Sequence, residues 1–288
     1  MEYVTFGKTG RKVSRLGFGG AAIGLKNYLH AYDPLDAGQR MDSIQAVRKA
    51  LESGINYFDS APGYGDGESE KIIGEALAGE DFSKMFIATK IGRQFEKGTA
   101  VENIEKSLTR LKAPVLDLVQ FHGMSYTEEE SRNILEPNGL LDELLDAKRQ
   151  GLIRHIGFTT EDNNKAVYDF IRDGRFDMYQ LCYNLFFQHA YDPNRPFGSL
   201  FEAEQENMGI AVMRPTTSGL FDKWMKMVDP DNRKNYTSDL IQFVFSNPLV
   251  DVVLVGMRSA KRVEQNVALC DTVEGRIDIL DLFKYYEG

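Results

Sequence analysis

The sequence predicts an α/β protein built as one (β/α)₈ barrel, also called a TIM barrel, with an N-terminal β-hairpin cap. The main observation is that strand-like and helix-like segments alternate from end to end, eight of each in strict order. The alternation repeats about every 30 residues, the length of one strand-plus-helix unit. No low-complexity tract, charge run or Pro/Gly-rich linker interrupts the series, so residues 1–288 are expected to form a single domain.

Four strands are predicted in the first half because short apolar runs there are rich in β-branched and aromatic residues. They are RLGFG (15–19), INYFD (55–59), MFIATK (85–90) and LDLVQFH (116–122). Segments with apolar residues at helical spacing follow each strand, and the first ends before Gly54, which can take a positive φ. The predicted helices are 41–53, 68–79, 100–112 and 139–151.

The second half continues the same alternation. The predicted strands are LIRHIGF (152–158), MYQLCYN (178–184), GIAVMRP (209–215) and VDVVLVG (250–256). The predicted helices are 163–174, 197–208, 237–247 and 259–270.

Three further segments lie outside this alternation. Residues 3–14, with Lys-Thr-Gly at their centre, predict a hairpin that caps the bottom of the barrel. Residues 20–39 and 221–236 read as long loops after strands. Loops in this position lie on the catalytic rim of a barrel, so both loops and the tail 277–288 are expected to shape a substrate pocket.

Composition excludes several classes of protein. The net charge of -9 argues against sequence-independent nucleic-acid binding, which requires clustered basic residues. The N-terminal residues lack a signal-peptide core, and no apolar run approaches the roughly 18 residues of a membrane helix. Cys182 and Cys270 have no metal-type spacing and are expected to be reduced core thiols. We therefore expect a cytoplasmic protein.

Four polar residues are expected to meet on one rim of the barrel. Asp59, Lys90 and His122 each end a predicted strand, at steps of 31 residues (90 − 59) and 32 residues (122 − 90), and Tyr64 follows Asp59 in the same loop. Because the carboxyl ends of parallel strands share one edge, these side chains should lie together. Singly, each has an ordinary structural reading as an ion pair, a turn residue or a core histidine. Jointly, they indicate a site that transfers protons, and hence an enzyme.

The four residue types have complementary roles in proton transfer. A phenol titrates near pH 10, and a lysine ammonium close to Tyr64 would favour the phenolate. Lys90 can supply this charge, with Asp59 keeping it protonated, and His122 can donate a hydrogen bond to a substrate oxygen. The assembly would protonate a carbonyl oxygen, but nothing in it supplies the two electrons of a reduction. A Schiff base on Lys90 is the alternative, disfavoured because Asp59 would keep the amine charged.

The chain resembles the aldo-keto reductases over nearly its whole length. The matching segments are NYFDSAPGYG (56–65), SEKIIGEAL (69–77), IATKIG (87–92), DLVQFHG (117–123), GLIRHIGFT (151–159) and VGMRSAKRVEQN (255–266). The resemblance implies that Tyr64 is the general acid, that Lys90 and Asp59 tune its pKa, and that His122 orients the carbonyl. It also implies NADPH, bound across the barrel mouth without a Rossmann fold, as the hydride donor.

The same resemblance implies a set of cofactor-binding residues. Those at the nicotinamide end are Gly20, Ala21, Asp59, Thr159, Thr160, Gln180 and Met213. The chain departs from the family here, because Thr159-Thr160 replaces the usual Ser-Asn and Met213 replaces the ring-stacking Tyr. Residues implied along the rest of the nucleotide are Arg214, Thr216, Gly219, Gly256, Arg258, Ser259, Arg262 and Asn266.

The residues after the last strand favour NADP over NAD. Arg258, Ser259 and Arg262 surround a predicted helix N-terminus, a suitable site for a 2′-phosphate, although a solvated basic helix face is the alternative reading. The expected function is NADPH-dependent reduction of a small-molecule aldehyde or ketone. The alternative is an NADP(H)-binding regulatory protein with little turnover, like the potassium-channel β subunits. No nucleic-acid or membrane partner is expected, and a monomer is the default.

Overall fold

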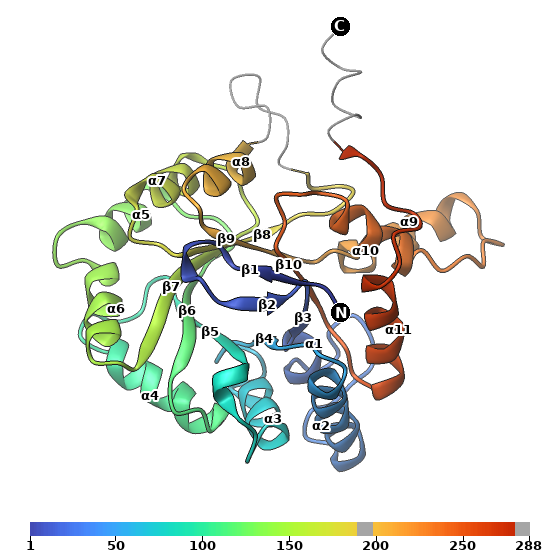
Figure 1. Cartoon of the computed structure of the whole chain (residues 1–288), viewed down its shortest axis with the longest axis horizontal. Helices are drawn as coiled ribbons and strands as arrows, with labels where there is room; N and C mark the ends of the chain where they lie inside the picture. The colour runs from blue at the N-terminus through green and yellow to red at the C-terminus, as the bar shows by residue number, and fades with distance from the viewer. Residues whose placement is uncertain (189–197, 280–288) are drawn as a thin grey trace, which may run out of the picture.

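The computed structural model describes residues 1–188 and 198–279. Eight parallel strands form a closed barrel in the order β10-β3-β4-β5-β6-β7-β8-β9, which confirms the predicted (β/α)₈ fold. The strands are β3 (Leu16–Gly19), β4 (Tyr57–Asp59), β5 (Phe86–Gly92), β6 (Leu116–His122), β7 (Ile153–Thr160), β8 (Met178–Cys182), β9 (Gly209–Met213) and β10 (Val252–Val255). Figure 1 shows the helices arranged around them.

The strand ends differ from the prediction at one of the predicted site residues. Strand β5 continues to Gly92, so Lys90 does not end its strand but lies two residues before the end, opposite Gln120 of β6. His122 does end β6, and it pairs with Gly92 and with Thr159 of β7. The predicted convergence still holds, because Asp59, Lys90 and His122 come from three adjacent strands.

The eight predicted helices are present. They are α2 (Ala37–Glu52), α3 (Glu68–Ala76), α4 (Ala100–Leu111), α6 (Leu140–Arg149), α7 (Lys165–Asp173), α8 (Gly198–Gln205), α10 (Thr237–Phe245) and α11 (Ala260–Cys270). Helix α2 begins before the predicted residue 41 because the Asp36 carboxylate caps it by accepting a hydrogen bond from the Gln39 amide.

Within the described part of the chain, three α-helices were not predicted. They are α1 (Ala21–Gly24), α5 (Glu128–Leu135) and α9 (Leu220–Val228), and the chain also forms short 3₁₀ turns η1 (Gly7–Thr9), η2 (Phe82–Lys84) and η3 (Thr217–Gly219). The predicted loops 20–39 and 221–236 are therefore partly helical. Helix α5 begins with a capping box, in which the Thr127 hydroxyl accepts from the Glu130 amide and the Glu130 carboxylate accepts from the Thr127 amide.

The N-terminal hairpin closes the bottom of the barrel, as predicted. Strands β1 (Tyr3–Thr5) and β2 (Lys12–Ser14) pair antiparallel, and Figure 1 shows the hairpin lying over the centre of the ring of strands. Phe6 follows β1 in the turn of the hairpin and is fully buried. Its ring packs edge-on against Tyr57 and Phe86 at centroid distances of 5.5 and 5.4 Å. Gly7 allows the hairpin turn to approach the start of β9 closely, since a Cβ on Gly7 would lie 2.3 Å from the Gly209 nitrogen.

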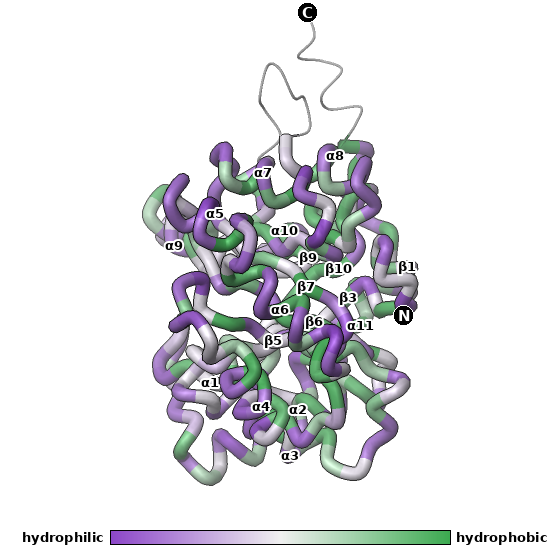
Figure 2. The backbone as a smooth tube through the Cα atoms, turned by 90° about the vertical axis from the view of Figure 1, so that its left-hand side faces the viewer, coloured by the Kyte–Doolittle hydropathy of each residue, from purple (hydrophilic) through white to green (hydrophobic). Residues whose placement is uncertain are grey.

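Burial follows the barrel. Figure 2 shows hydrophobic residues concentrated along the central strands and hydrophilic residues prominent on the outer turns and helices. Cys182 and Cys270 are both buried and free. Across the two described ranges, no helix is long and apolar enough to cross a membrane.

Phe6→Ala should lower the free energy of unfolding by about 3–5 kcal/mol, because it opens a cavity at the closed end of the barrel. Urea denaturation of variant and parent measures the change. Tyr3→Ala is the matched control, since Tyr3 lies on the same hairpin but is 48% exposed and makes one hydrogen bond from its hydroxyl to Gly54. A loss of only about 1 kcal/mol is expected there. Equal losses in the two variants would contradict the role given to Phe6.

Candidate active site

A buried ion pair lies at the base of the barrel mouth. The Lys90 ammonium donates to Asp59 Oδ1 over 2.6 Å and to the Ser60 carbonyl over 2.7 Å. The two side chains are 1% and 4% exposed, so the charges depend on each other and on these hydrogen bonds. Burial by itself would lower the pKa of Lys90, but Asp59 and the Tyr64 phenol outweigh it and hold that pKa above its ordinary value. The amine therefore remains a cation.

Tyr64 lies directly beside this cation, with the Lys90 nitrogen 4.9 Å from the centre of its ring. Burial raises the pKa of Tyr64, and the Lys90 charge opposes that rise without overcoming it. Lys90 therefore favours the phenolate, as expected, but burial leaves the pKa of Tyr64 above its ordinary value. The phenol is protonated at neutral pH, and the neighbouring cation favours the phenolate that proton loss would create.

His122 completes the group from the end of β6. Its ring packs edge-on against Tyr64 at a centroid distance of 5.7 Å. Burial, together with the charges of Lys90 and Arg93, lowers the pKa of His122 to about 3. The imidazole is therefore neutral at physiological pH, so it can offer one N–H to a substrate oxygen but cannot act as a charged acid.

Gln120 belongs to the same cluster, although it was not predicted. Its side chain is fully buried, and Nε2 donates to Asp59 Oδ2 over 3.1 Å. This bond satisfies the carboxylate oxygen that Lys90 does not reach, so Gln120 helps to orient Asp59. The signal was present in the sequence, because Gln120 lies two residues before His122 and therefore faces the same side of the strand.

A pocket of about 260 Å³ opens above this cluster. Asp59, Tyr64 and His122 lie in its wall, together with residues from the rims of seven strands. Predicted cofactor residues that also line it are Ala21, Thr159, Gln180, Met213, Arg214, Thr216 and Gly256. Gly20, Thr160, Gly219, Arg258, Ser259, Arg262 and Asn266 do not line it.

Two observations bear on whether these residues fit a nicotinamide. Gln180 is 1% exposed, and its Oε1 atom has no hydrogen-bond partner, while its Nε2 atom lies 3.7 Å from Met213 Sδ. An amide with unused hydrogen-bonding capacity in a pocket wall suits a ligand carboxamide. The Thr159 hydroxyl, in contrast, is already occupied, since it donates to the Gly123 carbonyl over 2.8 Å and accepts from the Gly123 amide.

Two of the residues predicted to bind the rest of the nucleotide, Arg214 and Ser259, already have partners within the protein. Arg214 forms a two-point ion pair with Glu161, with N–O distances of 2.9 and 2.6 Å. Its backbone has φ of 58°, and Asn184 holds its carbonyl oxygen at 3.0 Å. Ser259 caps α11 by accepting a hydrogen bond from the Arg262 amide, and the Arg262 side chain is exposed.

The substrate wall is only partly where it was expected. Loop residues Leu25, Tyr28 and Leu29 line the pocket, but no residue of 221–236 does. The loop after β6, which was not predicted to contribute, supplies Gly123 and Met124. The rest of the expected contribution, from residues 280–288, lies outside the described residues.

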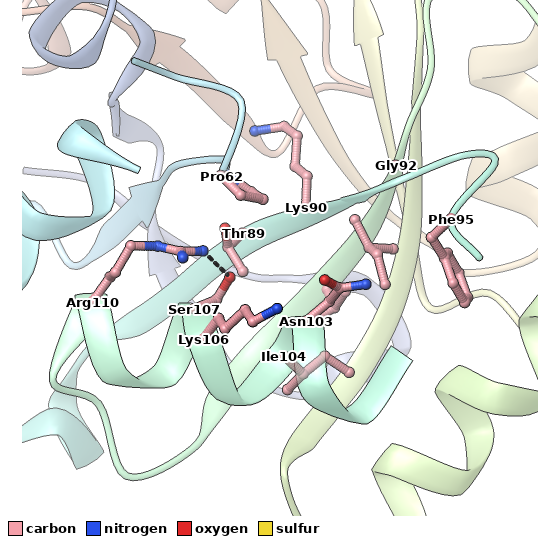
Figure 3. A pocket seen from close by; sticks show the side chains of 12 residues that line it. Pro62, Thr89, Lys90, Gly92, Phe95, Asn103, Ile104, Lys106, Ser107 and Arg110 are labelled. Carbon is pink, nitrogen blue, oxygen red and sulfur yellow. Dashed lines mark hydrogen bonds between the residues drawn. The ribbon is translucent and has the colours of Figure 1, made fainter. Parts of the chain in front are cut away.

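A second cavity, of about 210 Å³, lies on the other side of β5. Figure 3 shows Lys90 projecting from β5 away from the α4 residues Asn103, Ile104 and Ser107 that line this cavity. Successive residues of a strand face opposite sides, so Thr89 and Lys90 point in opposite directions. The cavity therefore lies behind the buried ion pair, and Lys90 is the residue of that cluster that borders it.

Comparisons with known proteins concern the chain as a whole. The profile of the aldo/keto reductase family matches residues 15–242. L-galactose dehydrogenase from Arabidopsis thaliana is 27% identical, with 95% of this chain and 89% of that protein aligned. The NADH-specific methylglyoxal reductase of Escherichia coli is 30% identical, with 64% of this chain and 60% of that protein aligned.

Solved structures show the same fold. An aldo/keto reductase from Klebsiella pneumoniae, determined in complex with NADP and acetate, superposes with a TM-score of 0.73 at 21% identity. The match covers 99% of this chain and 95% of that one.

The low pKa of His122 predicts how stability depends on pH. The native state keeps His122 neutral down to about pH 3, whereas the unfolded chain takes up that proton below its ordinary value of 6.5. The unfolded state therefore binds more protons in this window, and stability is lost as the pH falls from 6.5 towards 3. Between pH 7 and pH 5, wild type should lose about 1–2 kcal/mol more than His122→Asn in urea denaturation. Parallel losses in the two proteins would show that His122 titrates normally.

Proposed function

The chain belongs to the aldo/keto reductase family, and from this premise we propose that it is an NADP-dependent oxidoreductase that reduces an aldehyde or ketone to an alcohol. One observation carries the proposal. A protonated tyrosine and a neutral histidine face the same pocket, and a buried lysine ammonium lies 4.9 Å from the tyrosine ring. This arrangement can bind a carbonyl oxygen and protonate it.

The proton-transfer half of the reaction uses groups of this chain. His122 donates a hydrogen bond that orients the carbonyl oxygen beside the Tyr64 hydroxyl. Tyr64 then transfers its proton to that oxygen as negative charge develops there. The Lys90 ammonium stabilises the resulting phenolate, and Asp59 keeps Lys90 charged and in place. When bound, NADPH supplies the hydride that the carbonyl carbon accepts.

Residues of the pocket wall are suited to hold that cofactor. Gln180 offers its unpaired amide oxygen to the carboxamide, and Met213 offers an apolar, polarisable surface to the ring. Outside the pocket wall, the first turn of α11, with Ser259 and the exposed Arg262, would hold the 2′-phosphate. Thr159 would contribute through its position in the wall, since its hydroxyl is already bonded to Gly123.

The choice between NADPH and NADH depends on the site at the first turn of α11. A relative of this chain is an NADH-specific methylglyoxal reductase, so the family profile does not decide the matter. We favour NADPH because the N-terminus of α11, which is the positive end of the helix dipole, carries the exposed guanidinium of Arg262.

Tyr64→Phe tests the proposal. The variant lacks the proton donor, so kcat for NADPH-dependent reduction of small aldehydes and ketones should fall by about 10²–10⁴-fold. The NADPH Kd, followed by quenching of protein fluorescence, should stay within about twofold, because the ring itself is retained. NADPH consumption with a panel of carbonyl compounds measures the rate.

Tyr3→Phe is the control, because it removes a phenol hydroxyl at the closed end of the barrel. Unchanged turnover in Tyr64→Phe would refute the assigned acid. Tight NADPH binding by the wild-type protein, with no turnover of any carbonyl, would instead favour a regulatory nucleotide-binding protein.

A further inference from the structure

The loop between β3 and α2 forms one wall of the pocket, and its backbone is strained. Leu25, Tyr28 and Leu29 line the pocket from this loop. Asn27 and Leu29 have φ of 55° and 64°, and a left-handed conformation is unusual for a bulky residue such as leucine. Such conformations persist only where surrounding contacts enforce them. The contacts that hold this loop therefore determine the shape of the pocket.

The most distant of these contacts comes from Arg258, just after β10. Its Nε atom donates to the Ala22 carbonyl over 2.6 Å, and its Nη2 atom donates to the Tyr28 carbonyl over 2.7 Å. The guanidinium also lies over the ring of Tyr32, 4.3 Å from the centroid. One side chain thus bonds to both ends of the segment 22–28 and stacks on a third loop residue.

Tyr32 connects this arrangement to the body of the protein. It is 5% exposed, and its hydroxyl bonds with the Ile23 carbonyl at 2.9 Å and with the Ser43 hydroxyl of α2 at 2.8 Å. The Tyr32 carbonyl accepts from the Asn27 amide over 2.8 Å. Arg258 therefore lies against a surface that is itself fixed to the barrel.

We propose that Arg258 is a positioning residue, which holds the loop 22–32 as the substrate wall of the carbonyl pocket, and that it is not the residue that selects the 2′-phosphate. Two of its donors are bonded to backbone carbonyls of the loop, and a flat face is covered by Tyr32. A lysine cannot reproduce this geometry, since an ammonium lacks the planar fork that reaches two carbonyls while stacking on a ring. The effect on substrate binding rests on the proposed reductase function, whereas the effect on the loop does not.

Hydrogen–deuterium exchange of residues 23–32 in nucleotide-free protein tests the proposal without reference to activity. Amides such as those of Leu25 and Asn27 are protected by hydrogen bonds within the loop. In Arg258→Lys they should exchange about tenfold faster or more, because charged hydrogen bonds to the loop are lost. Arg258→Gln should behave in the same way. Loop exchange equal to that of wild type in both variants would overturn the proposal.

Arg276→Lys is the matched control. Arg276 also stacks on an aromatic ring, that of Phe245 at 5.3 Å, and donates to a backbone carbonyl, that of Cys270, but it does not line the pocket. It should leave exchange of the loop unchanged. Acceleration of the loop by this variant to the same extent as by Arg258→Lys would mean that any loss of an arginine loosens the loop, and would contradict a specific role.

Kinetics then separate positioning from phosphate recognition. In Arg258→Lys the KM for a carbonyl substrate should rise about tenfold, while kcat and the Kd values of NADPH and NADH stay within about twofold. A rise in the NADPH Kd alone, with unchanged loop exchange and unchanged carbonyl KM, would assign Arg258 to the phosphate and refute positioning. Faster loop exchange in a protein that reduces no carbonyl would uphold positioning and defeat only the proposed function.

Discussion

The Lys90 ammonium is enclosed inside the barrel, where bulk water cannot solvate it. Burying an ion this completely costs several kcal/mol of hydration free energy unless an opposite charge and hydrogen bonds offset the loss. Asp59 supplies the charge, the Ser60 carbonyl supplies a further acceptor, and Gln120 satisfies the second carboxylate oxygen. The charge of this compensated cation also acts on its neighbours, because it opposes the rise that burial causes in the pKa of Tyr64 and adds to the lowering that burial causes in the pKa of His122.

Much of the fold was predictable because local pattern and global topology agree. Apolar strand runs ended near Asp59 and His122, and parallel pairing brings such ends to one edge whatever the loops between them do. The convergence of the candidate site residues was therefore predictable to within the two residues by which β5 continues past Lys90. The hairpin was predictable from local sequence, since Lys-Thr-Gly lies between the two short segments that pair as its strands.

What was not predictable depends on contacts between distant residues. The capping box of α5 is visible in the sequence, but the helix has only one short apolar face and no long periodic run to mark it. The pKa of Tyr64 reflects a balance between burial and the charge of Lys90. The sequence reveals the lysine but not how deeply the phenol is buried. The bonds between Arg258 and the loop join residues 236 and 230 positions apart, so no local pattern could reveal them.

The seam of the barrel has a consequence for how the protein acquires its chemistry. Strand β10 pairs with β3, so that Val253 lies beside Leu16 and the first and last barrel strands close the ring. Asp59, Tyr64, Lys90 and His122 all precede β10 in the chain, and the ring that encloses them is complete only once the seam has closed. Without that enclosure, water would screen the charge of Lys90 and give His122 its ordinary affinity for a proton. Under the proposed function, the ability to protonate a carbonyl should therefore require a closed ring, so that turnover would report ring closure more directly than secondary-structure content.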